Sequence, residues 1–118
     1  MEPLPLASNE FSICISAIDS EQKAREIGAQ AVKARLASGV TIIPSGHSVY
    51  RWKGDVENAD ESVMLFYTRS SLAEALGTLV KELHPYEVCP FISIRTGSAL
   101  PEFLEWIGSN TASDVEDY

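Results

Sequence analysis

Apolar and polar positions follow two periods along the chain, one typical of strands and one typical of helices. Residues 11–18, 40–52 and 88–94 predict strands, and the continuous apolar run at 62–68, SVMLFYT, predicts a strand that is buried on both faces. The segment 44–46, PSG, interrupts the second strand. Its proline removes a hydrogen-bond donor, so we expect a bulge or a sheet edge there.

Three segments show the helical spacing of apolar residues, at 19–36, 71–83 and 100–107. Asp19 and Gln22 form a predicted capping box at the start of the first helix. The second helix begins with a similar Ser-x-x-Glu pair. It is expected to end before a proline, because the residue that precedes proline avoids the helical region.

The order strand-helix-strand-strand-helix-strand, followed by a short helix, predicts an α+β fold of the ferredoxin-like type. In this arrangement one antiparallel sheet carries both main helices on one face. The other face bears large apolar groups that a monomer would expose to water, so we expect an oligomer. The central pair of strands, residues 40–68, is long enough to protrude as a hairpin and to pair with a neighbouring copy. We expect a single domain over residues 10–108, with flexible tails at 1–9 and 109–118, the second of them acidic.

The charge of the chain argues against one class of partner. The 118 residues include 9 Lys and Arg against 17 Asp and Glu, and the net charge is −8. Nucleic acid is therefore not an expected ligand, because its phosphates are neutralised by clustered basic residues. No apolar run approaches the roughly 20 residues of a membrane helix, and the first residues lack a secretion signal, so we expect a cytoplasmic protein. Two cysteines are too few for a disulfide framework.

The sequence HPYEVCPF, between the second main helix and the last strand, holds the main candidate site residues. His84 carries an imidazole, which suits copper, zinc and nickel, and Glu87 follows across a proline turn. Alternatively, His84 caps the last carbonyls of the helix and fixes the turn. Tyr86 and Glu87 line a pocket at a subunit seam in one interpretation. In the other, Tyr86 packs at that seam with its hydroxyl bonded.

Two residues outside this sequence are further candidates. Trp52 belongs either to the core or an interface, or to the wall of a cleft. Arg69 lies between a buried strand and a helix cap, where it can bind an anion or a carboxylate such as Glu87, or form a structural salt bridge. The acids at 55, 57, 60 and 61 are interpreted as a solvated hairpin tip. The chain has no phosphate loop and no G-x-S-x-G, H-E-x-x-H or C-x-x-C motif, so we do not expect an enzyme.

Four segments together resemble one known family: ASGVTIIPSGHSVYRWKGDVE at residues 37–57, then LFYTR, HPYEV and LPEFLEWI. Because these segments occur in the same order as in the family, residues 11–107 of the chain resemble the CutA family of divalent-cation tolerance proteins. The resemblance implies a ferredoxin-like subunit and a tight homotrimer in which long hairpins meet, similar to PII signalling proteins. It also implies metal-ion binding and a regulatory role, with no catalytic activity.

The chain departs from the family pattern at several positions. A cysteine is frequent in the family where this chain has Gly39, and a lysine is frequent where it has Tyr67. A copper site ascribed to some members uses a cysteine at the end of the first strand together with the histidine of the HPY motif. Ile15 occupies that cysteine position, and Cys14 is expected to point to the opposite face of the strand. Of this pair, only His84 is retained.

These observations predict a homotrimer that binds divalent metal ions, copper first, and contributes to metal tolerance without catalysis. His84 and Glu87 are the predicted ligands, and Tyr86, Trp52 and Arg69 are predicted to shape the cleft. The alternative is a PII-like regulatory module that binds a small anionic metabolite or a protein partner in the same clefts. A third interpretation is a structural trimer whose partner binds the acidic tail.

Overall fold

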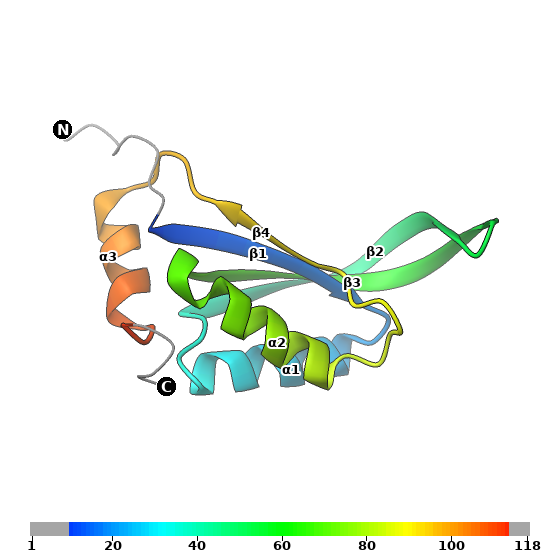
Figure 1. Cartoon of the computed structure of the whole chain (residues 1–118), viewed down its shortest axis with the longest axis horizontal. Coiled ribbons are helices and arrows are strands. Elements are labelled where there is room, and N and C mark those ends of the chain that lie inside the picture. Colours follow the sequence, from blue (N-terminus) through cyan, green and yellow to red (C-terminus); the bar gives the residue numbers. More distant parts are fainter. Residues whose placement is uncertain (1–9, 114–118) are drawn as a thin grey trace.

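The structure is a computed structural model that describes residues 10–113. Four strands and three α-helices follow one another in the order β1 (Phe11–Ile18), α1 (Glu21–Lys33), β2 (Gly39–Trp52), β3 (Asp55–Arg69), α2 (Ala73–Leu83), β4 (Phe91–Arg95) and α3 (Pro101–Ser109). The strands form one sheet in the order β2-β3-β1-β4, with antiparallel neighbours throughout (Figure 1). This arrangement confirms the predicted ferredoxin-like α+β fold. The tails predicted at residues 1–9 and, in part, at 114–118 lie outside the described residues.

The core lies between the sheet and the layer formed by α1 and α2 (Figure 1). Alternate side chains of β1 and β3 point into this layer, and Cys14, Ile18, Met64 and Phe66 are completely buried there. The helices supply their apolar stripes, with Ala24, Ile27, Ala31, Leu72, Leu76 and Val80 fully or almost fully buried. Burial of one large apolar side chain stabilises the fold by about 1.5–3 kcal/mol. This layer is therefore the main source of stability.

The other face of the sheet is apolar and largely uncovered. Ile15 pairs with Leu65 and Ile92 across the sheet, so these three side chains lie side by side. Helix α3 covers only one end of this face, where Phe11, Leu104 and Ile107 form a small second core with Tyr67. Elsewhere the face is open to solvent, and Ile43, Ile92 and Ile94 are each about half exposed.

β2 and β3 continue beyond the body of the molecule as a long hairpin (Figure 1). Their pairing runs to Trp52 and Asp55, and the two turn residues Lys53 and Gly54 have φ values of 50° and 88°. Two positive φ values match the right-handed twist of the strands, and glycine adopts such a value without strain. The predicted interruption at 44–46 is confirmed as a shift of register between Ile43 and Gly46.

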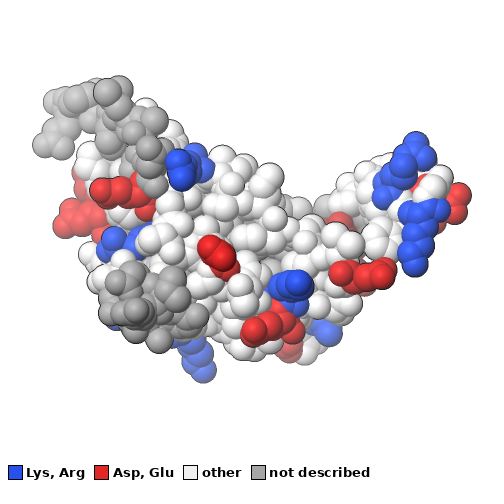
Figure 2. Space-filling model, viewed as in Figure 1, with Lys and Arg blue, Asp and Glu red and all other residues white. Residues whose placement is uncertain are grey.

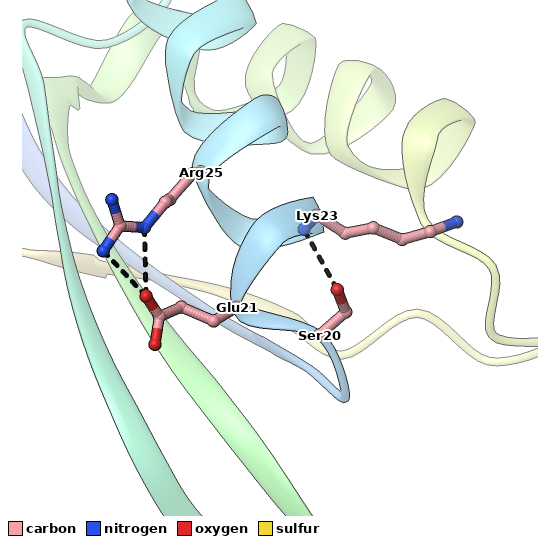
Figure 3. Close-up of polar contacts among 4 residues, drawn as sticks. All are labelled: Ser20, Glu21, Lys23 and Arg25. Atoms are coloured by element: carbon pink, nitrogen blue, oxygen red, sulfur yellow. Dashed lines mark hydrogen bonds and ion pairs between the residues drawn. The ribbon is translucent and has the colours of Figure 1, made fainter.

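The start of α1 differs from the predicted capping box (Figure 3). Ser20 is the N-cap, and its hydroxyl accepts a hydrogen bond from the Lys23 amide at 3.1 Å. Glu21 pairs with Arg25 one turn later at 2.7 Å, on the exposed side of the helix. Asp19 lies one residue too early for the cap, because β1 extends to Ile18 and a connecting residue is needed before the helix.

Three other predicted boundaries are also wrong. The second main helix is preceded by a short 3-10 turn at Ser70–Leu72, and no side chain within residues 10–113 caps either segment. The last strand begins at Phe91 rather than 88, because a loop with two prolines precedes it. β3 begins at Asp55 rather than 62, because its polar first half pairs with β2 in the hairpin and needs no apolar face.

The chain after α3 returns to the body of the molecule. Thr111 and Ala112 are buried, and the Ala112 amide donates a hydrogen bond to the Arg35 carbonyl at 3.0 Å. The expectation of an unpacked tail from residue 109 is therefore wrong for these two residues. These two small side chains fit against the body, which the acidic composition of the segment did not indicate.

Candidate functional site

An open cavity of about 600 Å³ lies where the hairpin leaves the body. Strand alternation places Gly46 and Ser48 of β2 on the same face as Ala59 and Glu61 of β3, and this face forms one wall. The loop between α2 and β4 forms the opposite wall. The lining consists of Ala17, Asp19, Ser48, Tyr50, Trp52, Ala59, Glu61, Tyr86, Glu87, Val88 and Pro90.

His84 holds that loop against β1 but does not line the cavity. It is the C-cap of α2 with extended backbone, as expected for the residue before Pro85. Its Nε2 donates to the Ala17 carbonyl at 2.7 Å, and its Nδ1 accepts from the Tyr86 amide at 3.2 Å. The side chain is buried, and each ring nitrogen already has a partner. A metal ion could reach either nitrogen only by breaking one of these bonds.

Tyr86 joins the loop to β3. Its hydroxyl donates to Glu61 Oε2 at 2.7 Å, and its ring packs edge-on against the His84 ring with centroids 4.4 Å apart. Burial raises the pKa of the Tyr86 phenol above its ordinary value. The Glu61 carboxylate raises this pKa further, both as hydrogen-bond acceptor and as a nearby charge, and the charge of Asp19 adds to the effect. The phenol is therefore a stable hydrogen-bond donor at neutral pH.

Trp52 and Glu87 also line the cavity, as predicted for a cleft. Trp52 is partly exposed, and Lys53 Nζ lies 5.5 Å from the centroid of its ring. Glu87 is exposed and has no hydrogen bond or ion pair with residues 10–113. Basic side chains gather at the far end of the hairpin, where Lys53 lies (Figure 2).

Arg69 does not shape the cavity. It lies at the end of β3 that pairs with Phe11, and its Nη2 donates to the Gly108 carbonyl at 2.7 Å. Its Nε donates to Thr111 Oγ1 at 3.1 Å. Arg69 therefore fastens α3 and the segment that follows it. Neither an anion site nor a salt bridge of Arg69 is seen within residues 10–113, where its partners are neutral oxygens.

Glu61 and Asp19 are lining residues that were not predicted. Glu61 was grouped with the solvated acids of the hairpin, but only 9% of it is exposed. Its position two residues before Val63 and four before Leu65 places it on the same sheet face, and this alternation was the available signal. Within residues 10–113, the lining of the cavity has three carboxylates, those of Asp19, Glu61 and Glu87, and no Lys, Arg or His. That charge opposes an anionic metabolite here.

Metal-binding groups are sparse in a single chain. Within residues 10–113, no group of three or more His, Cys, Asp or Glu side chains is placed to hold a metal ion. Cys14 is completely buried on the helical side of the sheet, and burial raises the pKa of its thiol. Ile15 points to the other side, as the alternation predicted. The thiol of Cys14 is therefore not available as a partner of His84.

The fold and the cavity define a class of protein: small ferredoxin-like α+β domains with a long protruding hairpin and a ligand-sized cavity at its root. Residues 12–110 match the family described as CutA1 divalent ion tolerance protein. The chain belongs to this family. None of the helices in residues 10–113 has the length and apolar character needed to cross a membrane.

Individual relatives agree with this assignment. "Protein CutA" of Mus musculus is 39% identical over 94 residues, which cover 80% of this chain and 53% of the mouse protein. The "Divalent-cation tolerance protein CutA" of Thermus thermophilus is 34% identical over 84% of this chain and 96% of its own length. The solved structure of the Thermus thermophilus protein matches with a TM-score of 0.84 and 33% identity, covering 86% of this chain and 99% of that one. The chain thus spans about half the length of the mouse and human relatives.

Proposed function

We propose that this chain forms a cytoplasmic homotrimer that binds divalent cations, copper first, and contributes to tolerance of these ions without catalysis. The observation that carries the proposal is the position of the acidic cavity, directly beside the uncovered apolar face of the sheet. Ala17 belongs to both, since it shares a face with Val63 and also lines the cavity. Copies that associate through this face would bring their cavities to a shared seam.

The apolar face supports association. Ile43, Ile92 and Ile94 are about half exposed in the single chain. Covering apolar surface contributes about 25 cal/mol per Å². The outer edge of β2 is also unpaired among residues 10–113 and can accept a strand from a neighbour. A closed ring of copies satisfies every such edge, whereas an open chain would keep growing.

The proposed ion site lies between copies. One chain does not bring three suitable side chains together within its described part, so neighbouring copies must complete the coordination. Glu87 is the proposed direct ligand, because its carboxylate is exposed at the rim and unpaired with residues 10–113. His84 enters the proposal as the residue that positions Glu87, because its two nitrogens hold the loop.

Isothermal calorimetry with Cu²⁺, Zn²⁺ and Ni²⁺, on the full chain at a measured oligomeric state, tests this proposal. We expect saturable binding tighter than about 1 µM, or about −8 kcal/mol, at one ion per chain or per trimer. Glu87→Gln should weaken binding at least about tenfold, or about 1.4 kcal/mol. Glu82→Gln on α2 is the matched control, because it makes the same charge change outside the cavity.

Two results would contradict the proposal. Weak heat without a defined stoichiometry would mean that the acidic surface only gathers ions. Equal affinities for the Glu87→Gln and Glu82→Gln proteins would remove Glu87 as a ligand and leave the cavity to another class of molecule.

A further inference from the structure

We propose that the cavity also binds an organic cation, specifically a primary ammonium group carried on an apolar body. This ligand goes beyond the proposed divalent ion and uses different groups of the cavity. The inference rests on the buried carboxylate of Glu61, on the aromatic walls and on the charge of the lining.

One oxygen of the Glu61 carboxylate is free to meet a ligand. Oε2 accepts the Tyr86 hydroxyl, whereas Oε1 has no hydrogen-bond partner within residues 10–113 and keeps contact with solvent. A carboxylate that is largely removed from water attracts a positive charge more strongly than a carboxylate in bulk solvent does. Tyr86 supplies only a neutral donor, and no basic side chain from the described part of the chain lines the cavity. A primary ammonium would supply the positive charge together with an N–H directed at Oε1.

Aromatic side chains next to this carboxylate suit the same ligand. Tyr50 and Trp52 stand on the wall of the cavity that the hairpin provides. The Lys53 ammonium lies 5.5 Å from the centroid of the Trp52 ring, which is within the distance of a cation–π contact. A cation over an aromatic face contributes about 0.5–1 kcal/mol at exposed sites and about 2 kcal/mol or more when it is desolvated.

The remaining lining explains why the ligand needs an apolar body. Ala17, Ala59, Val88 and Pro90 offer no polar side-chain atoms, so they gain nothing from a hydrated metal ion. The volume of about 600 Å³ is within the usual range of small-molecule sites. An anion of the same shape would meet three carboxylates and is expected to be rejected.

The test compares three compounds that share a phenyl group: 2-phenylethylammonium, the neutral 2-phenylethanol and the anion phenylacetate. Calorimetry of the full chain, with chelator present to exclude divalent ions, should show the amine binding at least about tenfold more tightly than the alcohol. Phenylacetate should not bind. Glu61→Gln should weaken amine binding at least about tenfold and leave the alcohol unaffected. Trp52→Leu should weaken both, and Glu82→Gln should change neither.

Several outcomes would overturn the proposal. Equal affinities for amine and alcohol would show that charge is not recognised, and full amine binding by the Glu61→Gln protein would remove the central group. The ammonium of Lys53, at the end of the hairpin, could compete with the added amine for the site. The amine is therefore also tested on the Lys53→Met protein, which lacks this group. Failure of the amine to bind both wild type and Lys53→Met overturns the inference. Because chelator is present and Glu87 is untouched, these results are independent of the divalent-ion proposal.

Discussion

At the scale of single residues, His84 is notable because both of its ring nitrogens form hydrogen bonds that hold the fold together. It joins the end of α2 to β1, which lies 67 residues earlier in the chain, and to the amide of Tyr86. The sequence offered the alternative that His84 fixes the turn after the helix, and His84 does hold this turn. The hydrogen bonds of His84 differ from those expected, since the imidazole contacts β1 rather than the last carbonyls of the helix.

Replacement of His84 should be costly for stability. His84→Ala leaves the Ala17 carbonyl and the Tyr86 amide without partners, and we expect a loss of about 2–3 kcal/mol in the free energy of unfolding. Urea unfolding followed by circular dichroism measures this loss. His47→Ala is the control, because its hydrogen bond with Asp60 is exposed and should contribute less than about 1 kcal/mol. Equal losses for the two variants would contradict the structural role of His84.

The raised pKa of Tyr86 predicts a specific dependence of stability on pH. The unfolded phenol has a pKa of about 10, so above that pH the unfolded chain releases a proton that the folded chain keeps. The unfolded state then binds fewer protons, and stability must fall as pH rises from about 10 through the folded pKa. Below about pH 10 the contribution of this phenol is complete and constant.

Unfolding experiments in urea between about pH 9 and 11 check this dependence. The free energy of unfolding of Tyr86→Phe should fall less steeply with pH than that of the wild type. Glu61→Gln should give an intermediate slope, because burial of the phenol remains while the nearby negative charge is removed. A wild-type slope in the Tyr86→Phe protein would show that another group controls the alkaline transition.

The sequence predicted part of the cavity at this scale. Trp52, Tyr86 and Glu87 line it as expected, and motifs next to a predicted turn were enough to single them out. Glu61 and Arg69 were misjudged for a common reason. The surroundings of each depend on a segment distant in sequence, namely the loop before β4 for Glu61 and α3 for Arg69, and local pattern carries no information on such contacts.

At the scale of elements, the bulge in β2 determines where the cavity begins. Gly46 faces Glu61 across the strands, directly after the shift of register. A Cβ atom at Gly46 would lie 2.8 Å from the Glu61 carbonyl oxygen, which is closer than side chains tolerate. Only glycine allows β2 to approach β3 this closely at the point where Glu61 turns toward the cavity.

Gly46→Ala should therefore destabilise the protein by about 1–3 kcal/mol, because the strands must separate to admit the methyl group. Chemical denaturation is again the measurement. Gly97→Ala serves as control, since its added Cβ would have no neighbour within 4 Å and should change stability by less than about 0.5 kcal/mol. An unchanged midpoint for Gly46→Ala would mean that the bulge relaxes without cost.

Secondary structure was predictable where a single apolar period dominates. β1 was predicted over 11–18 and observed over the same residues, because both of its faces carry apolar or small side chains. The first half of β3 was missed, because a hairpin outside the core needs only backbone pairing and leaves no apolar pattern. α1 and α2 each begin two residues later than predicted, since several nearby side chains are able to cap a helix, and α1 ends three residues earlier.

At the scale of the whole molecule, the sheet has one covered face and one open face. The covered face carries the core, and the open face ends at α3 on one side and at the cavity on the other. Apolar area of this kind on a chain of net charge −8 points to a specific contact, because the charge keeps copies apart elsewhere.

A charge placed in this face should dissociate the proposed trimer. Ile94→Glu would bury a carboxylate at every copy of the interface, and we expect monomers in sedimentation-velocity experiments at micromolar concentration. Val32→Glu introduces the same charge at an exposed apolar position of α1 and should leave the oligomer intact. A wild-type sedimentation coefficient for Ile94→Glu would exclude the open face as the interface.

Ala17 belongs both to the open face and to the cavity lining, and this shared position makes ligand affinity depend on protein concentration. Whatever binds the cavity lies against the surface on which neighbouring copies are proposed to meet. By thermodynamic linkage, a ligand that strengthens this contact must itself be held more strongly as the protein is concentrated. Affinities measured at nanomolar and at micromolar protein would then differ, and the abundance of the protein in the cell would set its response to the ligand.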